Sequence, residues 1–244
     1  MIRAALLLLA ALWAAPAMAV ECRDLTHDGN RFTICEVDAA HEDLRLFLND
    51  PEGQLLGQFY SIDAMLADRG QKLTFAMNAG MYHDDRAPVG HYVENGREEM
   101  RVITSSGPGN FGLLPNGVFC IRDARADVIE TLRFVETAPD CAYATQSGPM
   151  LVIDGALHPR FLPDSTSRYV RNGVGSTADG SRVVFAISRA PVTFHEFGRL
   201  FRDGLSLPHA LYFDGNISRL HAPQIGRSDT GFALGPIVGV VVSQ

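Results

Sequence analysis

The segment Leu211-Tyr212-Phe213-Asp214-Gly215-Asn216-Ile217-Ser218 places three large apolar residues directly before an acid, a glycine and further polar residues. An apolar run of this kind is typical of a buried β-strand. It predicts a strand that carries Asp214 to its own end, where the backbone turns away at Gly215. A carboxylate withdrawn from water is usually paired, hydrogen-bonded or catalytic. A simple Asp-Gly hairpin turn would give the same short sequence, so the rest of the chain has to decide.

Short apolar or alternating runs, separated by tight-turn signals, recur along the chain. The signals include Asn95-Gly96, Asp154-Gly155, Asn172-Gly173 and Asp179-Gly180. Two stretches are helical in character: residues 61–66, which Ser61 can cap, and residues 193–205, which open with a capping box and continue as an apolar stripe. The strand 183–187, the second helix and the strand 211–213 make a β-α-β unit. We expect a single α+β domain with a large twisted mixed β-sheet and a few helices.

The N-terminus has the form of a secretory signal peptide over residues 1–19. Arg3 precedes an apolar run over residues 4–15, and Ala17-Met18-Ala19 gives a small-x-small cleavage site. This run is short for a membrane span, and no later stretch is long enough for one. We therefore expect the folded domain to cover residues 20–244 and the protein to be periplasmic or secreted, with no membrane span.

Four cysteines follow the predicted cleavage site: Cys22, Cys35, Cys120 and Cys141. An even number in an exported chain favours two disulfide bonds. Of the three connectivities we prefer the local one, Cys22–Cys35 and Cys120–Cys141, which closes short loops. No Cys-x-x-Cys spacing indicates zinc or thiol redox chemistry.

Charge and motifs exclude several classes of function. The formal net charge is −7, whereas a nucleic-acid-binding protein usually presents a basic face, so no nucleic-acid partner is expected. The sequence contains no Gly-x-Ser-x-Gly elbow, no P-loop and no dinucleotide fingerprint, which leaves serine-hydrolase, nucleotide and nicotinamide chemistry without support.

Polar residues interrupt apolar strands in three clusters. In the first, over residues 75–82, a strand ends at Asn78 among small residues. In the second, over residues 167–175, Arg168 and Arg171 are three apart, so on an extended strand they point to opposite faces. We favour Arg171 for a site because it directly precedes a turn of small residues. The third cluster is the Asp214 segment.

These clusters, in this order, resemble the phosphodiester glycosidase family, which includes the lysosomal uncovering enzyme that removes N-acetylglucosamine from a phosphate on mannose. Residues 78–81 resemble the family's Asn-Gly-Gly-Phe strand end, residues 171–175 its Arg-Thr-Ala-x-Gly strand, and residues 214–218 its Asp-Gly-Gly-x-Ser strand end. Residues 146–151 are similar to its central glycine-rich strand. Ala79 and Asn216 stand where the family pattern has glycine, and the likeness is closer to a bacterial branch of unknown function.

The resemblance implies cleavage at the anomeric carbon of a sugar phosphate, and the residues suit that chemistry. Cleavage builds positive charge on the sugar and negative charge on phosphate. Asp214 is expected to act as nucleophile or general base, Arg171 to hold the phosphate, and Asn78 to orient the substrate. Further substrate-binding candidates are Asn172, Gly215, Ser218, Ser188, Gln146 and His91. No cofactor is expected, although the His83-Asp84-Asp85 segment could bind a divalent cation, so a metal requirement stays open.

The sequence thus predicts an exported hydrolase that cleaves a glycosidic bond at a sugar-1-phosphate diester or a related envelope glycan. The expected partner is a carbohydrate or sugar-phosphate substrate. Two alternatives stay open: a non-catalytic envelope module that binds glycan or assists exopolysaccharide assembly, and a metal-dependent phosphodiesterase that cuts the phosphorus–oxygen bond.

Overall fold

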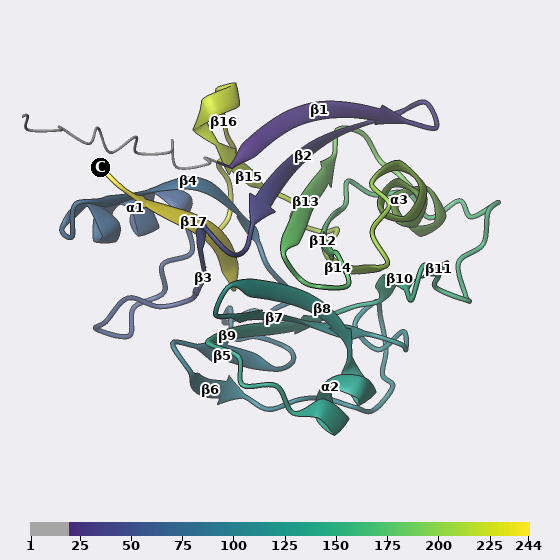
Figure 1. The fold of residues 1–244 in the computed structure, drawn as a ribbon, viewed down its shortest axis with the longest axis horizontal. Helices are drawn as coiled ribbons and strands as arrows, with labels where there is room; N and C mark the ends of the chain where they lie inside the picture. Colours follow the sequence, from purple (N-terminus) through teal and green to yellow (C-terminus); the bar gives the residue numbers. More distant parts are fainter. Residues whose placement is uncertain (1–19) are drawn as a thin grey trace, which may run out of the picture.

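The computed structural model describes residues 20–244, so the predicted signal peptide lies outside the described residues. The described residues form a single domain of β-strands and short α-helices (Figure 1), which confirms the predicted α+β class. The strands divide over three sheets, and every strand pair within residues 20–244 is antiparallel. The one large mixed sheet of the prediction is therefore three smaller sheets.

The seven-stranded sheet carries the Asp214 segment. Its strands, in spatial order, are β1 (Glu21–His27), β2 (Asn30–Asp38), β13 (Arg182–Ser188), β12 (Asn172–Ser176), β14 (His209–Asp214), β10 (Met150–Ile153) and β11 (Ala156–Leu157). β12 runs antiparallel to both neighbours, so β13 and β14 run parallel on either side of it. The predicted β-α-β unit is present, with β12 inserted between its two strands.

The other two sheets have five strands each. One has the order β16 (Arg227–Ser228), β15 (Leu220–Ala222), β4 (Gln71–Asn78), β17 (Ile237–Ser243) and β3 (Asp43–Phe47). The other has the order β6 (Arg97–Met100), β5 (Tyr92–Glu94), β9 (Tyr143–Ser147), β7 (Gly117–Arg122) and β8 (Arg125–Glu130).

One apolar core joins the three sheets. Phe185 of β13 lies 4.7 Å from Phe75 of β4 and 5.8 Å from Phe119 of β7, measured between ring centroids. Alternate residues of each strand face this shared core, as the two-residue period of a strand requires. Since each sheet buries one face here, its other face needs a separate cover.

The helices supply that cover, each on the outside of a different sheet (Figure 1). They are α1 (Phe59–Ala67), α2 (Thr131–Thr137) and α3 (Phe194–Arg199), and α3 continues as the π-helical turn η1 (Leu200–Gly204); a 3-10 turn, η2 (Pro223–Ile225), follows β15. The predicted capping box of α3 is confirmed, because Thr193 Oγ1 accepts from Glu196 N (3.1 Å) and Glu196 Oε2 accepts from Thr193 N (2.8 Å). α1 begins before the predicted Ser61, since Phe59 is buried with the helix's apolar face.

Both predicted disulfide bonds are present. Cys22 pairs with Cys35 across the β1–β2 ladder, and Cys120 of β7 pairs with Cys141 before β9. Such bonds are typical of proteins that fold in an oxidising compartment. Within residues 20–244, no helix has the length and hydropathy that a bilayer crossing requires.

Candidate active site

Three chain segments that are distant in sequence meet at the end of β14. Asn172 opens β12 and is the register partner of Asp214, the last residue of β14. Asn78 ends β4 in the neighbouring sheet, and its Nδ2 lies 3.4 Å from Asn172 Oδ1. Asn172 Oδ1 accepts from Asp214 N (3.1 Å), and Asn172 Nδ2 donates to Asn78 O (3.0 Å). The structure thus brings together the acid and both carboxamides that the sequence singled out.

The Asp214 carboxylate is held by backbone N–H groups of the turn that follows it. Its Oδ1 accepts from the backbone N–H groups of Gly215 (2.6 Å) and Asn216 (2.9 Å). The backbone N–H of Ile217 also stabilises the carboxylate, and no side chain between residues 20 and 244 donates to its Oδ2. Burial raises the pKa of Asp214 above its usual value, although these amides oppose the rise. The carboxylate is therefore fixed in orientation, with Oδ2 free of side-chain donors and available to a ligand.

Gly215 is required by the packing beneath this turn. A Cβ at this position would lie 2.1 Å from the hydroxyl oxygen of Tyr212, a distance that no real contact allows. Tyr212 itself is 1% exposed and cannot move outward without leaving the core. The Asp-Gly pair is thus explained by close approach of a side chain to the backbone.

Asn78 holds the loop after Asp214 through two hydrogen bonds. Its Oδ1 accepts from Arg219 N (2.9 Å), and its Nδ2 donates to Ile217 O (2.8 Å). Ser218 Oγ lies 3.1 Å from Asp214 O and 3.2 Å from Val170 O. The polar groups of Asn78 and Ser218 are used inside the protein, so these side chains shape the turn.

Arg171 lies behind the turn, in an aromatic enclosure. Its guanidinium carbon is 3.6 Å from the ring centroid of Phe194, and the rings of Tyr169 and Tyr212 lie 5.4 and 5.3 Å away. Nε donates to Val192 O (2.9 Å), and Nη2 donates to Ser167 O (3.2 Å). Only 1% of the residue is exposed, and burial lowers the pKa of the guanidinium. The arginine side chain is therefore closed off from solvent, and its Nη1 has no hydrogen-bond partner among the described residues.

Gln146, one of the expected substrate contacts, is saturated by other partners. Its Oε1 accepts from His91 N (3.1 Å) and Ile103 N (3.0 Å). Its Nε2 donates to Ile103 O (2.7 Å) and Thr131 Oγ1 (3.1 Å). All four hydrogen-bonding positions of the amide are filled within the third sheet and its surroundings.

His91 and Ser188 also make framework contacts. The His91 ring lies against Phe134 of α2, and its Nδ1 is 3.0 Å from Met100 O. Ser188 Oγ accepts from Arg171 N (2.9 Å). None of these contacts involves the Asp214 turn, so the structure does not bring the side chains of His91 and Gln146 to it.

Three buried donors that the sequence did not single out are linked through Tyr82, which is electrostatically coupled to Asp214. The hydroxyl of Tyr82, the Nε of Arg86 and the Nε of Arg219 are buried and have no hydrogen-bond partner among the described residues. Burial, with the nearby charge of Asp214, raises the pKa of Tyr82, while the charges of Arg86 and Arg219 oppose this rise. Tyr82 therefore lies within electrostatic reach of the acid and of both cations.

Local contacts fix these donors in place. Arg219 is 5% exposed, and its two terminal nitrogens donate to Phe232 O (2.5 Å) and Gln58 Oε1 (2.7 Å). The guanidinium of Arg86 lies 5.3 Å from the ring centroid of Tyr82. Unpaired buried donors are rare and need an explanation, for which a bound anion is one. A signal was available in the sequence, since Arg219 directly follows the Asp214–Ser218 motif and Tyr82 closes the first cluster.

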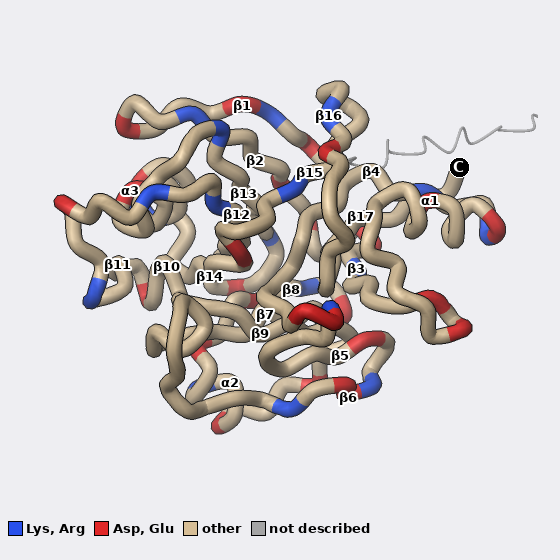
Figure 2. Tube along the Cα trace, turned by 180° about the vertical axis from the view of Figure 1, so that it is seen from behind, with Lys and Arg blue, Asp and Glu red and all other residues tan. Residues whose placement is uncertain are grey.

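Charge along the rest of the chain is mixed. Viewed from behind, basic and acidic residues alternate over the described elements rather than gathering on one face (Figure 2). Within residues 20–244, which include the His83-Asp84-Asp85 segment, no three His, Cys, Asp or Glu side chains are grouped so as to hold a metal ion.

Comparison with known proteins identifies the family. Residues 71–222 match the family model described as phosphodiester glycosidase. The uncharacterized protein YigE of Escherichia coli (strain K12) is 32% identical over 213 residues, which cover 86% of this chain and 83% of YigE.

Two solved structures share the fold. A hypothetical protein from Synechocystis has a TM-score of 0.61 at 12% identity, over 91% of this chain and 62% of that one. The catalytic domain of zebrafish N-acetylglucosamine-1-phosphodiester alpha-N-acetylglucosaminidase, auto-inhibited by its pro-peptide, has a TM-score of 0.60 at 11% identity, over 91% of this chain and 81% of that one. The family match spans Asn78, Asn172 and Asp214, which meet at the end of β14. The chain belongs to the phosphodiester glycosidase family.

Proposed function

We propose that the protein is an exported hydrolase that cleaves the bond between the anomeric carbon of a sugar and the phosphate oxygen of a sugar-1-phosphate diester. The observation that carries the proposal is the buried, unpartnered hydroxyl of Tyr82, which is electrostatically coupled both to the carboxylate of Asp214 and to the guanidinium groups of Arg86 and Arg219. The carboxylate of Asp214 suits the electron-poor sugar carbon, and the hydroxyl and guanidinium donors suit the departing phosphate.

The chemistry assigns a role to each group. As the bond breaks, the ring gains positive charge and the phosphate gains negative charge. Asp214 Oδ2 attacks the anomeric carbon or takes a proton from the attacking water. The phenol and the guanidinium N–H groups donate to the phosphate oxygens, in a site where dipoles and charges are already oriented. The phosphate monoester leaves as a stable anion, so no dedicated general acid is required.

Arg171 takes a supporting role in this proposal. Its guanidinium is enclosed by aromatic rings and bound by carbonyl oxygens, and it packs against Tyr212 beneath Gly215. We assign phosphate contact to Tyr82 and Arg219, because Tyr82 is coupled to Asp214 and to Arg219 at once. Arg171 acts as a positioning residue that fixes the floor of the Asp214 turn.

Exposed aromatic side chains beside the site support a sugar as the substrate. Tyr169 is 49% exposed, and its Cβ lies 3.5 Å from where a Cβ on Gly215 would be. Its backbone is tied to Val192 by two hydrogen bonds of an isolated β-bridge, so the ring is presented from a fixed backbone. Phe232 is 80% exposed and follows the loop that binds Arg219. Such rings offer flat apolar faces for the C–H groups of a sugar.

The periplasm or the extracellular space is the proposed location. The two disulfide bonds favour an oxidising compartment. The predicted signal peptide over residues 1–19 supports the same location.

The test is turnover of the methyl diester of N-acetylglucosamine 1-phosphate by the purified protein, with released sugar and methyl phosphate measured together. We expect equal amounts of the two products, and loss of both in Asp214→Asn. The matched control is Asp164→Asn, since Asp164 is an exposed acid outside the site. A wild-type rate in Asp214→Asn would refute the catalytic assignment. Loss of activity with chelator, recovered with a divalent cation, would instead favour the metal-dependent phosphodiesterase.

A further inference from the structure

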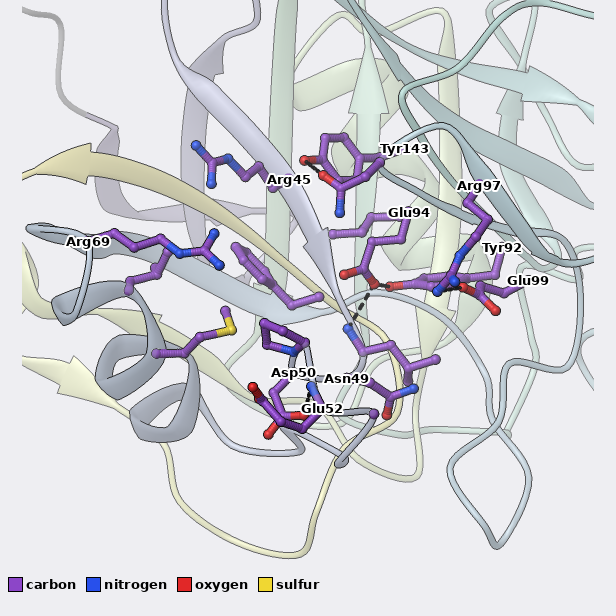
Figure 3. Close-up of a pocket in the computed structure, with 18 residues that line it drawn as sticks. Arg45, Asn49, Asp50, Glu52, Arg69, Tyr92, Glu94, Arg97, Glu99 and Tyr143 are labelled. Carbon is purple, nitrogen blue, oxygen red and sulfur yellow. Dashed lines mark hydrogen bonds and ion pairs between the residues drawn. The ribbon is translucent and has the colours of Figure 1, made fainter.

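A second cavity lies between β3, the end of α1 and the β5–β6 hairpin, and it shares no lining residue with the Asp214 turn (Figure 3). Its volume is about 720 Å³, within the range of small-molecule sites. The two five-stranded sheets meet here, because β3 packs against β5 and β9. Its polar lining includes Arg45, Asp50, Arg69, Glu94, Asn95 and Tyr143.

Glu94 presents a fixed acceptor to this cavity. Its Oε2 accepts from the Tyr92 hydroxyl (2.6 Å) and from Leu48 N (3.1 Å). Its Oε1 accepts no hydrogen bond from residues 20–244, and Figure 3 shows this oxygen directed toward the middle of the cavity. Burial raises the pKa of Glu94, which is the cost of keeping a carboxyl group in a partly dry site. The Tyr92 hydroxyl and Leu48 N–H thus hold the Glu94 carboxyl group through Oε2, while Oε1 can accept a hydrogen bond from a ligand.

Two arginines add donors to the lining of the cavity. Arg69, just beyond the end of α1, lines the cavity, and Figure 3 shows its guanidinium directed into it, with no hydrogen bond or ion pair to another lining residue drawn. Arg45 uses Nε and one terminal nitrogen on Asp43, which leaves its other terminal nitrogen free. Phe47, Met65 and Leu66 add apolar surface between these polar groups. The cavity therefore combines an acceptor, donors and an apolar floor.

The charges of the lining nearly cancel, which decides the class of ligand. Arg97 pairs with Glu99, and Asp50 accepts from the backbone of its own loop at Glu52 N (3.0 Å). A strongly charged ligand would meet groups of both signs. A neutral ring with several hydroxyl groups can donate to Glu94 and accept from Arg69 at once, while its C–H groups cover the apolar floor.

We propose that this cavity is a second carbohydrate-binding site that takes neutral hexose units, with Glu94 as the required acceptor and Arg69 as the principal donor. It is separate from the bond-cleaving site. It would hold the protein on a polymeric glycan while the Asp214 site works elsewhere on the same chain or on a neighbouring one.

The test is binding of two neutral probes, maltotriose and the trimer of N-acetylglucosamine, followed by NMR of backbone amides. We expect at least one trimer to give saturable shifts at residues 45–53, 66–69 and 94–97, with a Kd of about 1 mM. Glu94→Gln keeps an oxygen for Tyr92 and Leu48 and replaces the open acceptor with a donor. It should weaken binding about tenfold or more. Glu136→Gln, an exposed acid of α2 outside the cavity, should bind like the wild type.

Two outcomes would overturn the proposal: no shift at these residues with either trimer, or unchanged affinity in a folded Glu94→Gln variant. The measurement is made in the Asp214→Asn background, where no bond is cut. It therefore gives the same answer whether or not the proposed hydrolysis is correct, and turnover of the small methyl diester should be unchanged in Glu94→Gln.

Discussion

Replacing Asp214 with asparagine should abolish catalysis without weakening the fold. Burial raises the pKa of Asp214 in the folded state, so folding disfavours the ionised carboxylate. Below the pKa that Asp214 has in the unfolded chain, the group is protonated in both states and folding incurs no penalty for it. As the pH rises through the higher pKa of the folded state, the stability of the fold falls. At neutral pH the wild type carries the whole penalty, whereas asparagine carries none. The variant should therefore be at least as stable as the wild type at pH 7, and this advantage should disappear in acid.

Alanine at the same position provides the contrast. Asparagine still offers an oxygen to the N–H groups of Gly215 and Asn216, but alanine leaves both without a partner. Each unsatisfied buried group costs about 1–3 kcal/mol. Because this turn is only half-buried, we take the lower end, which gives about 2 kcal/mol for the pair. For a chain of this size that corresponds to a fall in Tm of about 4–8 °C relative to asparagine.

The assays are kcat on the methyl diester and Tm by calorimetry at neutral and acid pH. Both variants should lose activity about 10²- to 10⁴-fold or more, the range for removal of an acid–base group. A kcat near wild type in either variant would refute the catalytic role. Equal Tm values for asparagine and alanine would refute the account of how the carboxylate is held.

Three further results are expected. Tyr82→Phe should lower kcat/KM about 10- to 100-fold by removing one donor to the phosphate, with little change in Tm because the hydroxyl has no protein partner. The acid limb of kcat/KM against pH should lie above pH 3.8, since Asp214 must be ionised and its pKa is raised; a limb below that value would contradict the role of burial. Changing Cys22 and Cys35 together to serine should lower the free energy of unfolding by about 3 kcal/mol in denaturant titration, because the bond closes a short loop.

Much of the fold and part of the site could be predicted from local patterns. The apolar run before Asp214 predicted a strand that ends there, and the Thr193–Glu196 pair predicted the start of α3; both are present. Local spacing also favoured the correct disulfide bonds. The division into three sheets could not be predicted in this way, because strand pairing depends on contacts between segments far apart in sequence.

The orientation of Arg171 has a simple physical reason. Neighbouring residues on a strand point to opposite faces. Asn172 faces Asp214 across the β12–β14 ladder, so its neighbour Arg171 turns to the other side, under Phe194 of α3. The two-residue alternation of a strand, applied to Arg171 and Asn172 together, would have predicted that their side chains point to opposite faces. Arg219 was not chosen because its orientation depends on Asn78 and Gln58, which sequence alone does not place beside it.

The most direct test of bond cleavage at the sugar carbon is hydrolysis in heavy-oxygen water, with both products analysed by mass spectrometry. Attack at the anomeric carbon, by Asp214 or by water that it activates, places the heavy oxygen on the released sugar and leaves the methyl phosphate unlabelled. The label should therefore appear in N-acetylglucosamine alone. Label in the phosphate would show that the phosphorus–oxygen bond is broken, and would contradict the proposed reaction.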